Sequence, residues 1–144
     1  MKSSYRQFEH TGDLGIEASA PDEGSLFACC AGALFEILAG EGSIRPADSL
    51  RVEIEAPDHE LLMVRWLREL LFLQDARGWL FTSFDVVISE GREGQLRLSA
   101  TATGERFDPH RHRLLTGVKA VTYHEIEVTQ RPDLTWRARV LFDI

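Results

Sequence analysis

Two acidic residues at opposite ends of the chain carry side chains suited to metal binding. Asp13 stands where one alternating segment begins, and Asp143 precedes the last residue of the sequence, Ile144. If the final segment is a strand with Phe142 on its buried side, the Asp143 carboxylate and the α-carboxylate of Ile144 are held close together. Fixed anions repel each other unless a cation neutralises them. Joined by Asp13, they would form an all-oxygen site that suits Ca²⁺, Mg²⁺ or Mn²⁺ better than Zn²⁺ or copper.

The same residues also have ordinary structural explanations. Asp13 lies between Gly12 and Gly15, which permit a tight turn, and composition alone favours an Asx-turn role for this aspartate. The carboxylates of Asp143 and Ile144 could simply point into water. The residues by themselves therefore leave the metal site open.

A third group of polar residues lies between positions 104 and 124. Asp108, His110 and His112 have a spacing that could chelate a metal, although a loop with two solvated histidines is the favoured interpretation. Lys119 and His124 could serve in acid–base chemistry. Satisfied polar residues near the start of a strand explain them equally well.

Several motifs of catalysis and nucleotide binding do not occur in the sequence. The chain contains no GxxxxGK[ST] loop, no GxGxxG, no GxSxG and no CxxC pair. These motifs would have supplied a phosphate cradle or an activated nucleophile. Their absence favours a protein that is not itself an enzyme.

Charge and composition indicate which partners and which cellular compartment are compatible with the chain. Sixteen basic and 23 acidic residues give a net charge of −7, opposite in sign to a protein that grips nucleic acid by its phosphates. We therefore expect no strong direct nucleic-acid binding, whereas a basic or metal-rich partner is compatible. No apolar run is long enough to span a membrane or to act as a signal peptide. The adjacent Cys29 and Cys30 are expected to be reduced core residues, which favours the cytoplasm.

Hydrophobic periodicity predicts the elements that must position these residues. Alternation with period two predicts strands over 14–20, 50–56, 96–103 and 136–143. A helical period predicts one helix over 23–39, with Asp22 as its N-cap and Gly40 as its stop. A second helix is predicted from the N-cap Asp58 to near Gly78, and a third, shorter one over 114–121.

The order of these elements indicates the class of fold. Strict βαβ alternation is missing, so a doubly wound nucleotide-binding sheet is disfavoured. We predict a two-layer α+β fold, with mixed or antiparallel sheets packed against two main helices and one short helix. Residues 1–144 are expected to form a single domain, because no linker or repeat interrupts them.

Several phrases in the sequence together resemble the archease family. They are F-E-H-T-G-D-L-G over 8–15, D-H-E-L-L-M-V-R-W-L-R-E-L-L over 58–71, the G-E-x-x-D-x-x-x-H spacing over 104–112, V-K-A-V-T-Y-H over 118–124 and F-D-I over 142–144. The resemblance covers the whole chain. Gly12 stands where the family has alanine, a change that should loosen the turn without removing a ligand.

The resemblance implies a function and a set of site residues. Archease is an accessory protein in tRNA splicing and RNA repair, and assists an RtcB-type RNA ligase that forms a guanylate on a histidine using GTP and Mn²⁺. It promotes this guanylation and repeated turnover of the ligase. By resemblance the metal ligands are Asp13, Asp143 and Ile144, with Ca²⁺ or a related ion. Candidate supporting or partner-contact residues are His10, Glu105, Asp108, His112, Lys119 and His124.

Two alternatives from other functional classes stay open at this stage. A general chaperone or protein-modulating module would also need no catalytic machinery. A metal-dependent phosphodiester hydrolase could use the same carboxylates, with His124 or Lys119 as acid or base. The accessory role is favoured because the carboxylates offer a ligand set without an evident substrate cleft.

Overall fold

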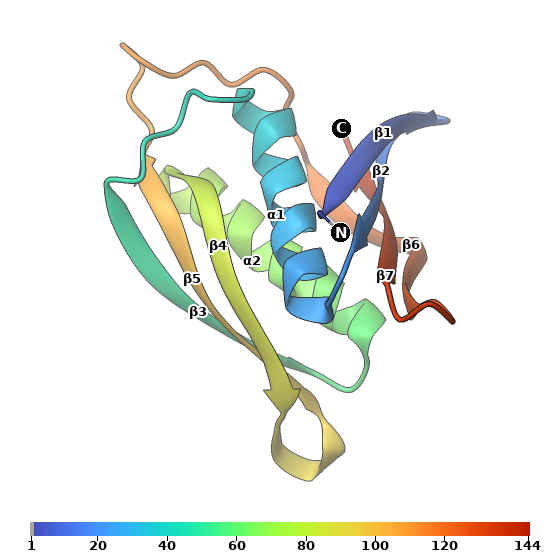
Figure 1. Cartoon of the computed structure of the whole chain (residues 1–144). Helices are drawn as coiled ribbons and strands as arrows, with labels where there is room; N and C mark the ends of the chain where they lie inside the picture. Colours follow the sequence, from blue (N-terminus) through green and yellow to red (C-terminus); the bar gives the residue numbers. More distant parts are fainter. Residues whose placement is uncertain (1) are drawn as a thin grey trace.

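Seven strands form two antiparallel sheets, and two helices lie between them (Figure 1). The computed structural model describes residues 2–144. The four-stranded sheet has the order β1-β2-β7-β6 and the three-stranded sheet the order β3-β5-β4. The elements are β1 (Ser4–His10), β2 (Asp13–Ala20), α1 (Glu23–Ala39), β3 (Asp48–Ala56), α2 (His59–Arg77), β4 (Trp79–Glu90), β5 (Leu96–Arg106), β6 (Ala120–Gln130) and β7 (Trp136–Asp143). The predicted α+β class is confirmed.

Both main helices begin and end where the sequence predicts. The side chain of Asp22 accepts the Ser25 N–H at 2.8 Å, and Asp58 accepts the Leu61 N–H at the same distance. Such N-caps satisfy amide groups that the first helical turn leaves without partners. The helices end at Gly40 and Gly78, whose positive φ angles of 82° and 73° favour glycine.

The helices share one apolar core with both sheets. Each helix packs against strands of both sheets, with α1 on β2 and β4 and α2 on β3 and β6. Trp66 of α2 is fully buried, and its indole Nε1 donates a hydrogen bond to the carbonyl oxygen of Phe27 in α1 at 3.0 Å. That bond fixes the two helices against each other. Within residues 2–144, no helix is long and apolar enough to cross a membrane.

The short helix predicted over 114–121 is wrong. This segment has no helical hydrogen bonds; Leu115 instead donates its N–H to the carbonyl of Leu38 at 2.7 Å, and β6 begins at Ala120. Short helices depend on burying an apolar face. Leu114 and Leu115 are 45% and 61% exposed, so these two leucines do not bury the face that a helix here would need. The third helical element of the described chain is a single 3₁₀ turn at Arg92–Gly94, between β4 and β5.

The last strand lies in the interior of the four-stranded sheet. β7 pairs with β2 on one side, in the register Leu14–Phe142 and Asp13–Asp143, and with β6 on the other. Phe142 is fully buried, as the alternating pattern of the final segment predicts. The chain end therefore returns to the turn near Asp13.

Truncation of Phe142 should strongly destabilise the protein. Replacing a fully buried phenylalanine by alanine removes its apolar burial and leaves a cavity, so Phe142→Ala is expected to lower the free energy of unfolding by about 3–5 kcal/mol. Chemical denaturation measures the change. Val87→Ala, at a 59% exposed position, is the control and should leave the unfolding midpoint nearly unchanged. Equal effects of the two substitutions would contradict a pinned chain end.

Candidate functional site

One end of the four-stranded sheet gathers most of the predicted site residues. β1 ends there at His10, β2 begins at Asp13, β7 ends at Asp143 and β6 begins at Ala120. Figure 1 shows the C-terminus at this end, beside the β1–β2 hairpin. Six of the nine candidates belong to this end of the sheet or to β6: His10, Asp13, Lys119, His124, Asp143 and Ile144. The other three, Glu105, Asp108 and His112, lie at the end of β5 and in the loop that follows.

Asp13 and Asp143 are direct partners across the β2–β7 ladder. Residues in such a position point to the same side of the sheet, with Cβ atoms about 4.5–5.5 Å apart, and like charges placed this way repel. Among residues 2–144, no lysine or arginine forms an ion pair with either carboxylate. The nearest basic side chain is that of His10, whose Nδ1 lies 3.8 Å from Oδ2 of Asp13. The pair therefore concentrates negative charge that a cation would neutralise.

The main chain holds Asp143 on both sides. Asp143 pairs with Asp13 in β2 and with Ala120 in β6, and its carbonyl accepts the N–H of Lys119 at 2.7 Å. Ile144 follows directly, so its α-carboxylate lies one residue beyond a fixed point of the sheet. The three anionic groups expected from the sequence thus belong to neighbouring positions.

The donor set fits a hard cation. Within the described part of the chain, no three side chains of His, Cys, Asp or Glu converge as a metal cage. Asp13 and Asp143 supply two carboxylates, and the α-carboxylate of Ile144 is the third anionic group available. Ligands made only of carboxylate oxygen, completed by main-chain oxygen or water, suit Ca²⁺, Mg²⁺ or Mn²⁺.

A bulge in β6 connects this end of the sheet to β1. The β6–β7 register shifts between Thr122 and Glu127, so the residues between them leave the ladder. Glu125, at a positive φ of 55°, places Oε2 3.0 Å from His10 Nε2 and 3.1 Å from His124 Nε2. Because β7 and β2 lie between β6 and β1, Glu125 reaches across the outer side of the sheet. The sequence pattern had not singled out Glu125, since a bulge interrupts the alternation by which strand faces are recognised.

Two buried polar atoms near the bulge have no hydrogen-bond partner. They are Nδ1 of His10 and Oγ1 of Thr122. A buried polar atom without a partner typically costs about 1–3 kcal/mol, so such atoms usually bind water or a ligand. His10 pairs with Asp13 in the β1–β2 register. Its free ring nitrogen therefore lies beside the candidate metal centre.

His112 belongs to a separate cluster with a structural role. Its position there contradicts both the solvated loop and the metal chelate considered for this segment. It is only 5% exposed, so the interpretation of 104–112 as a loop with two solvated histidines is wrong for this residue. Its Nδ1 accepts the N–H of Asp108 at 2.8 Å, and Nε2 lies 2.9 Å from Glu105 Oε2. The proton must then reside on Nε2. With both ring nitrogens used and His110 exposed, the Asp108–His110–His112 chelate does not form.

Glu105 is the centre of this structural cluster. It accepts the N–H of Arg45 at 2.6 Å, a hydrogen bond from His112 and an ion pair from Arg111. Burial alone would raise the pKa of Glu105, but these donors outweigh it and lower the pKa below its ordinary value. The cluster fastens the loop after β5, and that loop leads directly to Lys119 and β6.

Lys119 directly precedes β6, and His124 lies in the segment where the β6–β7 register shifts. Both are exposed, and Nε2 of His124 lies 3.1 Å from Oε2 of Glu125. Lys119 also borders a groove of about 610 Å³ between α2 and the start of β6, together with Arg68 and Phe72. Their role in proton transfer stays a prediction.

Comparison with known proteins places the chain in one family. Residues 5–144 match the Archease protein family. The chain is 36% identical to "Protein archease" of Pyrococcus furiosus over 97% of this chain and 98% of that protein, and 38% identical to "Protein archease" of Sulfurisphaera tokodaii over 88% and 89%. The solution structure of Methanobacterium thermoautotrophicum protein 1598 superposes with a TM-score of 0.83 at 34% identity, covering 97% of this chain and 98% of that one.

Loss of the Glu105 charge should destabilise the protein in a pH-dependent way. Glu105→Gln is expected to lower the free energy of unfolding at neutral pH by about 1–3 kcal/mol, because three donors lose a charged acceptor. The folded-state pKa is below the ordinary 4.5, so this stabilisation is present above that value and is lost as the pH falls through the folded pKa. The difference between wild type and variant should therefore shrink in acid.

Denaturation at neutral and acidic pH measures this difference. Glu53→Gln is the matched control, since Glu53 is ion-paired to Arg97 at 2.7 Å but 49% exposed and should matter little. A Glu105→Gln deficit that stays constant down to the acid limit would show that the charge is not responsible.

Proposed function

This chain belongs to the archease family, and on that premise we propose that it is a non-enzymatic activator of an RtcB-type RNA ligase. In this role it promotes guanylation of the ligase and repeated turnover during tRNA splicing or RNA repair in the cytoplasm. The proposal includes a bound divalent cation, Ca²⁺ in the first place and Mg²⁺ or Mn²⁺ otherwise. Its ligands are Asp13, Asp143 and the α-carboxylate of Ile144.

The cross-strand pairing of Asp13 with Asp143 carries the proposal. Two carboxylates that face the same side of a sheet, without a lysine or arginine partner in the described chain, are costly unless a cation joins them. A hard cation, when bound, supplies positive charge and coordination positions that exchangeable oxygen ligands can occupy. Its retention by the protein therefore depends on the pairing of β2 with β7.

The rigid display of this acidic end explains how the chain could act on a partner. Strand pairing on both sides of Asp143 fixes its main chain, and Glu125 from the β6 bulge contacts His10 on β1. Tyr123 and Ile144 are 49% and 41% exposed and provide apolar contact area close by. We propose that this end approaches the metal- and triphosphate-binding site of the ligase and arranges the groups there.

The net charge of the chain also favours a basic RNA ligase as its partner. The chain carries −7, and an RNA-binding ligase must present basic surface to its substrate. Opposite charge increases the rate of encounter and helps to orient the partners, although it adds less to final affinity. An acidic activator of a basic enzyme fits this pattern.

Neutralising either aspartate should abolish activation without unfolding the protein. Asp13→Asn and Asp143→Asn keep the shape of the side chain but remove a metal-binding charge, so we expect at least a tenfold loss in stimulation of ligase guanylation. Binding of Ca²⁺ and Mn²⁺, measured by calorimetry, should weaken in parallel. Asp85→Asn, on β4 of the other sheet, is the control. Wild-type stimulation by both variants would remove this site from the mechanism.

An extension of the chain beyond Ile144 should reduce stimulation of the ligase as much as those substitutions do. A Gly-Ser pair added after Ile144 converts the α-carboxylate into a neutral peptide group, which removes an anionic ligand. Stimulation of guanylation is expected to fall, while the same pair added before Ser4 should be harmless. Full activity of the extended protein would show that the α-carboxylate is not needed.

Two further assays separate this function from the alternatives. The protein alone should not hydrolyse phosphodiester substrates with Mg²⁺ or Mn²⁺. It should also fail to suppress the aggregation of unrelated denatured proteins in a light-scattering assay. Activity in either assay that the Asp13→Asn substitution abolishes would favour the hydrolase or chaperone function instead.

A further inference from the structure

A polar hollow lies on the outer side of the four-stranded sheet, at the end opposite the candidate metal centre. Its volume is about 460 Å³, and it lies between the outer faces of β1, β2 and β7 and the β6–β7 turn. Ser19 lies six positions along β2 from Asp13, so this part of the hollow is roughly 20 Å from the candidate metal centre. The two features are therefore separate sites on one sheet.

The strand register assembles the floor of the hollow. Ser4, Ser19 and Arg137 are consecutive partners across β1, β2 and β7, and therefore form one row on the outer side. Arg6 and Glu17 are also direct partners. Each lies two positions from the serine of its own strand and therefore points to the same side of the sheet. The hollow thus presents two hydroxyl groups and two guanidinium groups within a small area of sheet.

Glu17 holds the two guanidinium groups together. Its Oε2 lies 2.8 Å from Arg6 and 3.1 Å from Arg137. Burial acts to raise the pKa of Glu17, but the two arginines lower it overall, so the carboxylate is charged. A guanidinium has five N–H donors. Each arginine uses one of them on Glu17, and both keep donors for a second acceptor.

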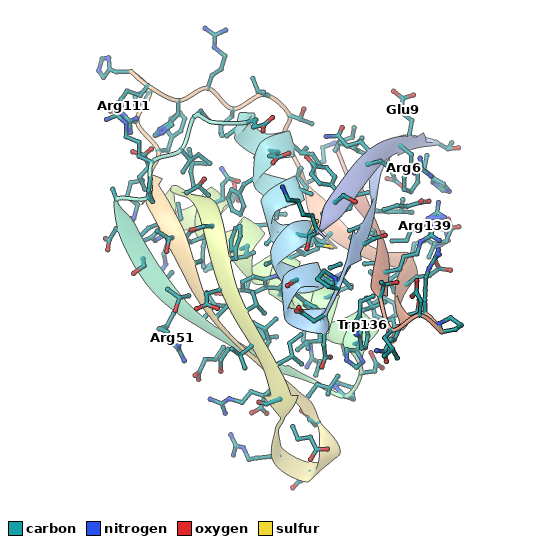
Figure 2. The ribbon with its side chains drawn as sticks, in the orientation of Figure 1. Arg6, Glu9, Arg51, Arg111, Trp136 and Arg139 are labelled. Carbon is teal, nitrogen blue, oxygen red and sulfur yellow. The ribbon has the colours of Figure 1, made fainter. Side chains whose placement is uncertain are left out.

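Two more arginines add charge beside this floor. Arg131 lines the hollow from the β6–β7 turn and has no ion-pair partner within residues 2–144. Arg139 stacks its guanidinium 4.5 Å from the centre of the Phe8 ring, and its buried Nε has no hydrogen-bond partner. Gly15 makes room for that ring, since a Cβ there would lie 2.2 Å from Phe8 Cζ. Figure 2 shows Arg6 and Arg139 close together on this side of the sheet.

We propose that this hollow binds a phosphate group, through Arg6, Arg137 and Arg131 with the hydroxyls of Ser4 and Ser19. Its three arginines outnumber its two acids, Glu17 and Asp133, in a chain whose net charge is −7. One oxygen of Asp133, Oδ1, also accepts hydrogen bonds from both the N–H and the hydroxyl of Thr135. Planar guanidinium groups match the oxygen geometry of phosphate.

The phosphate group can be a free oxyanion or belong to one nucleotide of a nucleic-acid strand. A single small cluster is too limited to give the strong, salt-dependent grip of a nucleic-acid-binding face. It can instead position one phosphate group while the acidic end of the sheet contacts the ligase. The inference is independent of the activator function, since it uses none of the candidate metal ligands.

Titration of the full chain with inorganic phosphate tests the site. Nitrogen–proton NMR spectra are recorded at low ionic strength with a chelator present, so that a cation at Asp13 and Asp143 cannot bridge to phosphate. Shifts are expected at Ser4, Ser19 and Arg137. Arg6→Gln and Arg137→Gln should each weaken binding about tenfold, the loss of one charge-assisted contact. Glu17→Gln should strengthen it, because a competing anion is removed.

Arg51→Gln is the matched control for these substitutions. Arg51 lies on an edge strand like Arg6, has the same 66% exposure and is also ion-paired to a glutamate, but it belongs to the three-stranded sheet. Its substitution should change phosphate binding less than twofold. Thermal unfolding of every variant checks that the sheet is intact.

A second titration with short oligoribonucleotides identifies the source of the phosphate. Tighter binding of an oligonucleotide at the same residues, weakened by Arg6→Gln, assigns the site to nucleic acid. Binding of inorganic phosphate alone assigns it to a free oxyanion. The proposal is overturned if neither ligand shifts these residues, if Arg51→Gln weakens binding as much as Arg6→Gln, or if Glu17→Gln weakens binding in a folded protein.

Discussion

The pairing of β2 with β7 is the constraint on which the rest of the molecule depends. It places a strand from the end of the chain in the interior of a sheet that begins with the first residues, and one ladder then determines several features at once. Leu14 and Phe142 meet on the core side, and Asp13 and Asp143 meet on the outer side. A shift of one residue would exchange these faces and bury the carboxylates. The core and the candidate metal centre are therefore fixed by the same set of hydrogen bonds.

The outer side of the four-stranded sheet carries two chemically different regions. At one end are acidic groups, where the His10 ring lies near both Asp13 and Glu125. At the other end arginines surround Glu17 and the serine hydroxyls. Phe8, lying over Gly15, separates the two regions with an aromatic ring. The three-stranded sheet contributes to the first region only indirectly, through Glu105 and His112, which fasten the loop that leads into β6.

Features determined by local interactions could be predicted from the sequence. Both helices follow from apolar periodicity, with aspartate and glycine at their ends, and the final strand follows from its alternation. The meeting of Asp13 with Asp143 was expected from the buried side of that strand together with the family resemblance. The bulge in β6 and the role of Glu125 could not be foreseen, because they arise from contacts between distant strands. The burial of His112 is a different case, because its two ring nitrogens are satisfied by Asp108 and Glu105, which are near in sequence but lie in a loop without the periodicity that predicts burial.

The central position of β7 has a consequence for the synthesis of the protein. On the ribosome, β1, β2 and β6 all emerge before the strand that must lie between β2 and β6. Until residue 143 has left the exit tunnel, β2 and β6 each expose an edge that can pair with other chains. Completion of this sheet is consequently a late event, because the β2–β7 ladder joins residues from opposite ends of the chain, and such long-range pairing slows folding. A nascent chain of this kind spends much of its synthesis open to aggregation and to cellular quality control.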